Sequence, residues 1–574
     1  MSNQTSLQKI ILENKVLTPE QLKAAVQQAA EKRIPLEDEL IGENLISEAL
    51  LYETLASGLN LPYTDLTAQN IRRDILTLLP EPIIQVHNVA VFDRTDTEVK
   101  LAMTDPHDLQ VIDFVAKKTN RKPVVYVTTP TGIKNVLKQY RRTLHGEFEH
   151  ITASTSDSAA NEQDLKQLAQ DVPVIRVVDT LLEYAVFEGA SDIHIEPTEH
   201  DTIIRYRIDG VLREVMTLPK KVQSGVVARI KILSNLKIDE HRLPQDGRFK
   251  IHTDEYTVAF RVSILPVFDG EKVVLRLLNE SAQVLSLEQL GLQPQALAIV
   301  QANVKKPHGQ IFVSGPTGSG KTTTLYTIIS VLNTPKVNIS TIEDPIEYRM
   351  PRVNQTQVNP KIGMTFAAGL RALLRQDPNI IMVGEIRDEE TAEISAHAAL
   401  TGHLVLSTIH TNDAVTVLPR LTEMKVPTFL IASTTNMIIA QRLVRKICQH
   451  CIESYTMSRQ ALIELQKQIK VDYLVDTLIN AGAIVPGQKI EDLLFYRGRG
   501  CKHCNDEGYK GREGIYEVLE MNNDLAKIIQ ENGTAQDLRK IATSAGMLTM
   551  LQDGFLKAKS GVTTIEEILR VTKE

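Results

Sequence analysis

Four short apolar runs in the second half of the chain are separated by stretches with helical periodicity. They span residues 310–314, 337–342, 380–384 and 404–409. Nearly uninterrupted apolar strands that alternate with helices are typical of a parallel sheet covered on both faces, so we expect an α/β fold here. Ligands of such sheets bind beyond the carboxyl ends of the strands. The residues that follow each run are therefore candidates for a functional site.

Residues 1–66 carry a weak helical repeat, because apolar positions of one half recur in the other. The paired positions are Leu7 and Leu36, Ile11 and Leu40, Leu17 and Ile46, Leu22 and Leu51, and Val26 and Leu55. Thr18 and Ser47 occupy equivalent N-cap positions, and Pro19 and Gln21 complete the start signal in the first copy. We therefore expect two helical hairpins.

Two further modules and a linker are predicted before the apolar runs. Residues 67–145 alternate helical patterns with short strands, which predicts a small α/β module; the strands are expected at 89–92, 99–102 and 124–128. Residues 146–167 contain a small, polar tract without an apolar period, typical of a flexible linker. Residues 168–285 predict an α+β domain, with a helix at 172–188 and strands at 202–208 and 256–263.

A glycine-rich loop joins the first apolar run to a helix-forming segment. It reads Gly315, Pro316, Thr317, Gly318, Ser319, Gly320, Lys321, Thr322, with Thr323 next, and fits the phosphate-binding pattern G-x-x-x-x-G-K-[ST]. Glycines let backbone N–H groups point inward, and the helix dipole adds positive potential. We expect Lys321 to reach the β- and γ-phosphates of ATP, and the Thr322 hydroxyl to bind Mg²⁺.

Acidic residues follow two other runs. Glu385 ends the run at 380–384 and is expected beside the metal, with Mg²⁺ bound directly or through water. Glu343 follows the run at 337–342 and is expected to orient and deprotonate the attacking water. Glu347 is a second candidate there, although a solvated turn carboxylate fits it as well.

Histidines and arginines complete the candidate site. His410 lies at the carboxyl end of the run at 404–409 and is expected to sense the γ-phosphate, whereas His403, at the other end, fits a turn cap or a subunit contact. Arg205 and Arg207 share one face of a strand. They suit an arginine finger that acts on a neighbouring subunit, and an ordinary solvated face fits them equally.

All four cysteines fall in two C-x-x-C pairs, Cys448 with Cys451 and Cys501 with Cys504. This spacing predicts a closed structural Zn²⁺ site with four thiolate ligands. A redox dithiol is the poorer alternative, since neither pair follows a thioredoxin-like strand. Residues 453–500, largely helical in pattern, are then expected to form an insertion whose two ends are held together by the metal site.

The charge balance and hydropathy limit the function classes. The net charge of −7 and the pI of about 6.1 disfavour electrostatic binding of nucleic acid. The polar start of the chain lacks the features of a signal peptide, and no long uncharged apolar run is present. We therefore expect a cytoplasmic protein.

Taken together, these motifs resemble those of the type II/type IV secretion ATPase family, and in particular its type IV pilus assembly motors. The resemblance rests on the cysteine pairs and on the segments 191–196, 205–210, 315–322, 341–347, 374–388 and 393–410. It implies a RecA-like P-loop ATPase domain at 286–574, which includes a zinc module at 445–515 and helices at 516–574. It also implies Glu343 as the water-activating acid, Glu385 as the metal-side acid, and arginines acting in trans.

The same resemblance implies partners and a location. It implies a homohexamer at the cytoplasmic face of the inner membrane, bound to a platform protein and to pilus or secretion assembly proteins. Retraction motors of the family lack the long N-terminal region and the cysteine pairs, which favours assembly. A type II secretion motor is the main alternative. A DNA-translocating RecA-like motor would be marked by basic loops, which the sequence does not show. A non-hydrolysing scaffold would require the loss of a catalytic acid, but Glu343 and Glu385 are both present.

The N-terminal repeat resembles a cyclic-di-GMP-binding module whose copies open with Arg-Leu-Gly and close with Gln. Here Ser6-Leu7-Gln8 and Pro35-Leu36-Glu37 replace the openings, and Ala29 and Gly58 stand at the glutamine positions. Without those arginines the phosphate contacts lose their main donors. We expect a docking domain that does not bind this nucleotide.

Overall fold

The structure is a computed structural model, and it describes residues 2–32, 36–76, 78–79, 81–140, 166, 168–252, 257–279, 284–468, 471–504 and 506–572. Two compact units make up the chain: residues 1–250 with 260–277, and residues 251–259 with 278–574. The predicted linker at 146–167 lies, except for residue 166, outside the described residues. Among the helices that are described, none is both long and apolar enough to cross a membrane.

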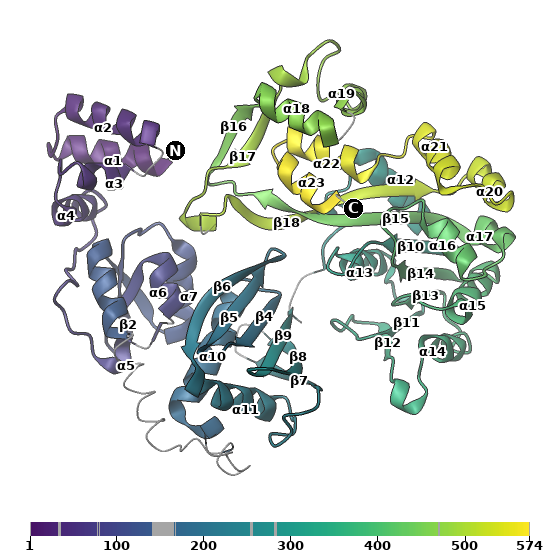
Figure 1. Cartoon of the computed structure of the whole chain (residues 1–574), viewed down its shortest axis with the longest axis horizontal. Coiled ribbons are helices and arrows are strands. Elements are labelled where there is room, and N and C mark those ends of the chain that lie inside the picture. The colour runs from purple at the N-terminus through teal and green to yellow at the C-terminus, as the bar shows by residue number, and fades with distance from the viewer. Residues whose placement is uncertain are drawn as a thin grey trace. The chain divides into compact units, whose positions relative to one another are not determined.

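The first unit begins with the expected helical hairpins (Figure 1). They consist of α1 (Ser2–Glu13), α2 (Pro19–Lys32), α3 (Leu36–Gly42) and α4 (Glu48–Gly58). The predicted N-caps are confirmed: the Thr18 hydroxyl accepts from the Gln21 N–H at 3.3 Å, and the Ser47 hydroxyl accepts from the Leu50 N–H at 3.3 Å. Paired positions of both copies, such as Leu7 and Leu36, meet in one apolar core, so each hairpin covers the other.

The predicted small α/β module follows. It contains α5 (Arg73–Leu76), α6 (Glu81–His87), β1 (Val89–Arg94), β2 (Glu98–Met103), α7 (Leu109–Thr119) and β3 (Lys122–Val127). Strand β2 pairs antiparallel with β1 and parallel with β3, and α7 connects the parallel pair. The three predicted strands are therefore confirmed.

A six-stranded sheet with two helices follows, in the strand order β6-β5-β4-β9-β8-β7. Its elements are α10 (Val172–Phe187), β4 (Asp192–Pro197), β5 (Asp201–Ile208), β6 (Val211–Pro219), α11 (Gln223–Leu233), β7 (Gln245–His252), β8 (Thr257–Val267) and β9 (Gly270–Asn279). Tyr206 is fully buried on the helix-covered face, where its hydroxyl donates to the Leu181 carbonyl at 2.6 Å. The alternation of β5 therefore puts Arg205 and Arg207 on the opposite face, as predicted.

The second unit is built on a seven-stranded sheet in the order β12-β11-β13-β14-β10-β15-β18. The strands are β10 (Gly309–Ser314), β11 (Ile339–Glu343), β12 (Val353–Gln357), β13 (Ile380–Val383), β14 (Leu404–Ile409), β15 (Thr435–Ile447) and β18 (Tyr509–Glu520). All pairs are parallel except β15 with β18. The four apolar runs are confirmed as parallel strands. Strands β12 and β18 are rich in polar residues, and β15, whose apolar residues 437–440 lie between polar ones, was also not predicted.

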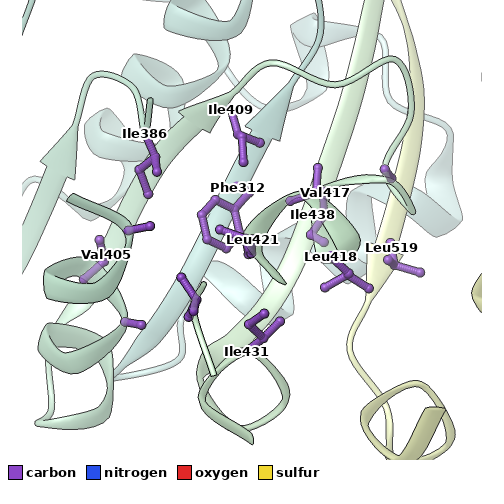
Figure 2. Close-up of a cluster of buried hydrophobic side chains, with 14 of the residues drawn as sticks. Phe312, Ile386, Val405, Ile409, Val417, Leu418, Leu421, Ile431, Ile438 and Leu519 are labelled. Atoms are coloured by element: carbon purple, nitrogen blue, oxygen red, sulfur yellow. The ribbon is translucent and has the colours of Figure 1, made fainter. Parts of the chain in front are cut away.

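Helices cover both faces of this sheet. They are α12 (Pro294–Val304), α13 (Lys321–Leu332), α14 (Phe366–Leu373), α15 (Glu389–Leu400), α16 (Val417–Glu423) and α17 (Thr428–Thr434). Figure 2 shows Phe312 and Ile438 on neighbouring strands, pointing toward the side chains of Leu418, Leu421 and Ile431. The alternate residues of β10 pack in a second cluster with Tyr326 of α13. Continuous apolar strands are thus needed because each face has its own core.

The cysteine-bearing insertion and the C-terminal helices complete the second unit. They comprise β16 (Ile452–Thr456), α18 (Arg459–Gln468), α19 (Val471–Asn480), β17 (Leu494–Gly498), α20 (Asn523–Gln530), α21 (Ala535–Ser544), α22 (Met550–Lys559) and α23 (Ile565–Thr572). The insertion is helical in its middle, but β16 and β17 pair antiparallel at its base. The predicted boundary between residues 515 and 516 falls inside β18, which serves both the insertion and the main sheet.

Candidate functional site

The glycine-rich loop leaves β10 at its carboxyl end and enters α13. Gly315, Gly318 and Gly320 have φ angles of 144°, 80° and 89°, which side-chain-bearing residues rarely adopt. A Cβ on Gly315 would also lie only 2.5 Å from the Gln441 carbonyl oxygen. Pro316, Thr317 and Gly318 are exposed at the tip of the loop, and Lys321 opens the helix. The loop therefore has the curled backbone that was predicted.

Gln441 on β15 braces this loop, and the sequence analysis missed it. Its buried amide donates to the Ser319 carbonyl at 2.7 Å and accepts from the Thr324 hydroxyl at 2.8 Å. The side chain thus ties the loop and the first turn of α13 to the strand beside β10. The available signal was a glutamine directly after the apolar residues of 437–440.

The structure brings Lys321, Glu385 and His410 together at the carboxyl edge of the sheet. Glu385 follows β13, and its Oε2 lies 3.5 Å from Nε2 of His410, which follows β14. Its Oε1 lies 2.6 Å from Arg387. The Lys321 ammonium donates to the carbonyl oxygens of Gly315 at 2.9 Å and Pro316 at 3.0 Å.

Burial and neighbouring charges set the protonation of this cluster. Burial lowers the pKa of Lys321, while Glu385 raises it. Burial and the Lys321 charge lower the pKa of His410, so its imidazole is neutral near pH 7. Arg442, half-buried on β15 and also missed from the sequence, donates to Asn412 at 3.2 Å and further lowers the pKa of Lys321. This edge of the sheet therefore presents positive charge around one carboxylate.

Glu343 ends β11 with a fully buried carboxylate. Its Oε1 accepts from the Thr341 hydroxyl at 2.5 Å and from the Gln355 amide at 3.2 Å, and its Oε2 accepts from the Tyr326 hydroxyl. Burial raises the pKa of Glu343, and these hydrogen bonds oppose that rise. Glu347 lies half-buried in the turn that follows.

His403 lies at the opposite end of β14 from His410. Its ring Nδ1 is 2.9 Å from the Ala398 carbonyl oxygen, at the turn that connects α15 to β14. This is the turn-capping position, one of the two alternatives for this residue. The two histidines therefore act at different edges of the sheet.

Arg205 and Arg207 belong to the first unit, where both form ion pairs. Arg205 lies 2.6 Å from Glu196, and Arg207 lies 3.4 Å from Asp192. Lys272 and Arg276 pair with the same two acids, at 2.8 and 3.0 Å. Burial raises the pKa of Glu196, but hydrogen bonds from Arg205 and Lys272 outweigh this effect and lower the pKa to about 2. Four basic side chains thus share two carboxylates, which leaves this sheet face positive.

The four cysteines meet where β15 and β18 pair. Cys448 and Cys451 follow β15, and Cys501 and Cys504 precede β18, so the antiparallel pairing closes the cluster. Sulfur–sulfur distances are 3.8 Å for Cys448 to Cys501, 3.8 Å for Cys451 to Cys504 and 3.7 Å for Cys501 to Cys504. A tetrahedron with Zn–S bonds of about 2.3 Å has edges of about 3.8 Å, so the donor set fits zinc.

The sequence of the chain is similar to those of known proteins. Residues 167–570 match the family described as type II/IV secretion system protein, and residues 59–147 match the MshEN domain. The chain is 37% identical over 572 residues to the type IV pilus assembly ATPase PilB of Myxococcus xanthus, covering 98% of each chain. It is 38% identical over 584 residues to type II secretion system protein E of Xanthomonas campestris, covering 100% of this chain and 99% of that one.

Among solved structures, the chain is similar to the ATPase DotB of Legionella pneumophila. The identity is 23% and the TM-score 0.49, with 69% of this chain and 95% of that chain covered.

The brace formed by Gln441 generates the first prediction. Gln441→Ala leaves the buried Thr324 hydroxyl unpaired and the loop unsupported, at a cost of about 1–3 kcal/mol, so the affinity for ATP should fall about tenfold or more. Titration with a fluorescent ATP analogue measures it. Gln295→Ala, which removes an exposed glutamine of α12, is the matched control. Equal affinities of the two variants would show that the brace has no role.

Proposed function

The chain belongs to the type II/IV secretion system protein family, and we propose that it is an ATP-hydrolysing motor that drives the assembly of type IV pili. The observation that carries this proposal is the convergence of the phosphate loop, Lys321, Glu385 and His410 at one sheet edge, in a chain that is similar over nearly its whole length to a pilus assembly ATPase. The equally long similarity to a type II secretion protein keeps that motor as the alternative.

ATP binding rests on the loop and on Lys321. The positive φ angles of the three glycines turn backbone N–H groups toward the phosphates, and the N-terminus of α13 adds positive potential. Lys321 is held near the loop by two carbonyl oxygens, which a phosphate oxygen replaces as the stronger partner. The loop residues 315–323 together form the proposed nucleotide site.

The residues at the sheet edge also fit Mg²⁺. The half-buried Thr322 hydroxyl and the Glu385 carboxylate are oxygen donors of the kind that this ion prefers. A Mg²⁺ ion held there would supply positive charge to neutralise the charge that develops during phosphoryl transfer. Glu385 would hold the ion directly or through water, and the neutral His410 would donate to the γ-phosphate.

Glu343 is the proposed base. Its raised pKa brings its basicity closer to neutral pH, where a general base works best. It takes a proton from the water whose oxygen forms a new bond to the γ-phosphorus, while the bond from that phosphorus to the bridging oxygen of ADP breaks. Phosphoryl transfer depends mainly on such positioning and charge neutralisation.

The proposed assembly is a homohexamer at the cytoplasmic face of the inner membrane, on a platform protein of the pilus machinery. The support is the family membership and the positive sheet face of the first unit, where Arg205 and Arg207 share two carboxylates with two further cations. A guanidinium on such a face suits a phosphate of a neighbouring subunit. No nucleic-acid partner is proposed.

Zinc is the proposed occupant of the four-cysteine cluster. The tetrahedral spacing of the sulfurs supports it, and so do the N–H groups of Cys501 and Gly508, which donate to the Cys504 sulfur at 3.3 and 3.2 Å. Bound zinc closes the base of the insertion and fixes the end of the β15–β18 pair.

The N-terminal helices are proposed as a docking domain that does not bind cyclic-di-GMP. Ala29 is buried in the apolar core, and a side chain on Gly58 would meet Ile10 at 2.5 Å, so neither glutamine position of the nucleotide-binding signature is open here. Pro35, in the second altered opening, lies outside the described residues.

Three substitutions test the nucleotide site. Lys321→Ala should abolish ATP turnover because the main cation on the phosphates is lost. Glu343→Gln and Glu385→Gln should retain ATP binding and lose about 100-fold or more in turnover, since they act on water and metal. Steady-state phosphate release measures turnover, with Glu423→Gln, an exposed carboxylate of α16, as control. Normal hydrolysis by either acid variant would remove that residue from the mechanism.

Metal analysis tests the zinc site. The purified chain should contain about one zinc per chain, because four thiolates at this spacing form a closed site. Cys501→Ser should lose the metal and increase proteolysis between residues 445 and 515. Stoichiometric zinc in this variant, with unchanged proteolysis, would exclude four-thiolate coordination.

Calorimetry of the full chain tests the docking domain. Cyclic-di-GMP should give no binding heat at micromolar concentration and should not change ATP turnover. Burying a doubly charged dinucleotide without guanidinium partners would cost about several kcal/mol. Micromolar affinity would contradict the prediction and require contacts other than those of the Arg-Leu-Gly signature.

A further inference from the structure

Tyr326 links the phosphate-loop helix to the proposed base. The residue lies on α13, five positions after Lys321, and its side chain is fully buried. Its hydroxyl donates to Oε2 of Glu343, at the end of β11. The helix that begins at the phosphates therefore also holds the carboxylate that is proposed to act on water.

The hydrogen bonds around Glu343 distinguish its two oxygens. Oε1 accepts from Thr341 and from Gln355, which occupy both of its lone pairs. Among the described residues, Oε2 accepts a hydrogen bond from Tyr326 alone, so one lone pair of Oε2 is left to take a proton. The carboxylate cannot rotate without breaking these bonds, because each donor comes from a different position on β11, β12 or α13.

Tyr326 is itself held in place and kept protonated. Its ring meets that of Tyr348 edge-on at 4.6 Å, and the Gln355 amide lies 3.4 Å from its hydroxyl oxygen. Burial and the charge of Glu343 raise its pKa, so the phenol remains a donor at any working pH. The titratable groups that face this pair are Tyr348, which also has a raised pKa, and Glu347 in the turn after β11.

We propose that Tyr326 is a positioning residue that orients the Glu343 carboxylate and selects Oε2 as the atom that accepts the proton of the attacking water. This rests on the proposed function of Glu343 as base. The proton moves from water to Oε2 as the water oxygen bonds to the γ-phosphorus and the bridging oxygen leaves with ADP, and Glu343 then returns the proton to solvent. Because α13 carries Lys321 and Tyr326 together, phosphate contact and base orientation belong to one rigid element.

The pH dependence of turnover in the full chain tests the proposal. A base must be ionised, so activity falls as pH decreases through its pKa. Tyr326→Phe removes one hydrogen bond to the anion while burial remains, and the pKa of Glu343 should rise. We expect the acidic limb of kcat to move upward by about one pH unit and kcat at neutral pH to fall about tenfold, with KM for ATP within about twofold of wild type.

Tyr348→Phe is the matched control, because its ring belongs to the same cluster without a hydroxyl on Glu343. It should leave the acidic limb in place. A second variant, Gln355→Met, removes a donor to Oε1 and should also move the limb upward, which keeps the test decisive if Tyr326→Phe folds poorly. An unchanged limb in Tyr326→Phe would overturn the proposal, and so would an unchanged limb in Gln355→Met if Tyr326→Phe does not fold.

Glu343→Gln separates this proposal from the one on which it rests. If that variant hydrolyses ATP at the wild-type rate, the base assignment itself fails. If it is inactive while Tyr326→Phe keeps the wild-type pH profile, the base stands and only the positioning role of Tyr326 fails.

Discussion

The parallel register of the central sheet is the constraint on which the functional site depends. Ser314 pairs with Ile409, and Val383 pairs with Ser407, so strands β10, β13 and β14 end at nearly the same level. The phosphate loop and His410 directly follow β10 and β14, and Glu385 follows β13 after Gly384. A shift of register by one residue would turn each side chain of the shifted strand to the other face of the sheet. The residues of the site would then no longer lie together.

The core explains why this register is fixed. Phe312 and Ile438 belong to one apolar cluster (Figure 2). Their neighbours Ile311 and Ile439 belong to the other cluster. Both faces are buried, so a slipped strand would exchange two packed sets of side chains at once, at a cost of several fully buried apolar residues, each worth about 1.5–3 kcal/mol.

A buried carboxylate connects the site to the C-terminal helices. Glu517 on β18 accepts from the Ala414 N–H at 3.0 Å, in the loop that follows His410, and from the Met550 N–H at 3.1 Å, at the start of α22. Helix α22 is bonded in turn to the insertion, where the Gln552 amide donates to the Thr477 hydroxyl at 2.7 Å. A series of hydrogen bonds therefore connects the loop after β14 to α22 and to the helical part of the insertion.

The sequence by itself determined the phosphate loop, the parallel strands, the helical repeat with its caps and the cysteine spacing. Each rests on local chemistry: glycine at positive φ, uninterrupted apolar runs, or paired ligands with two residues between them. The sequence analysis did not predict the roles of Gln441 and Tyr326. It also did not predict the ion pairs that Arg205 and Arg207 form with Glu196 and Asp192. These roles depend on which strand or helix lies opposite, and a polar strand such as β12 carries little local signal. Only the tertiary structure, by setting strand order and register, decided that the helix of the phosphate loop would also hold Glu343.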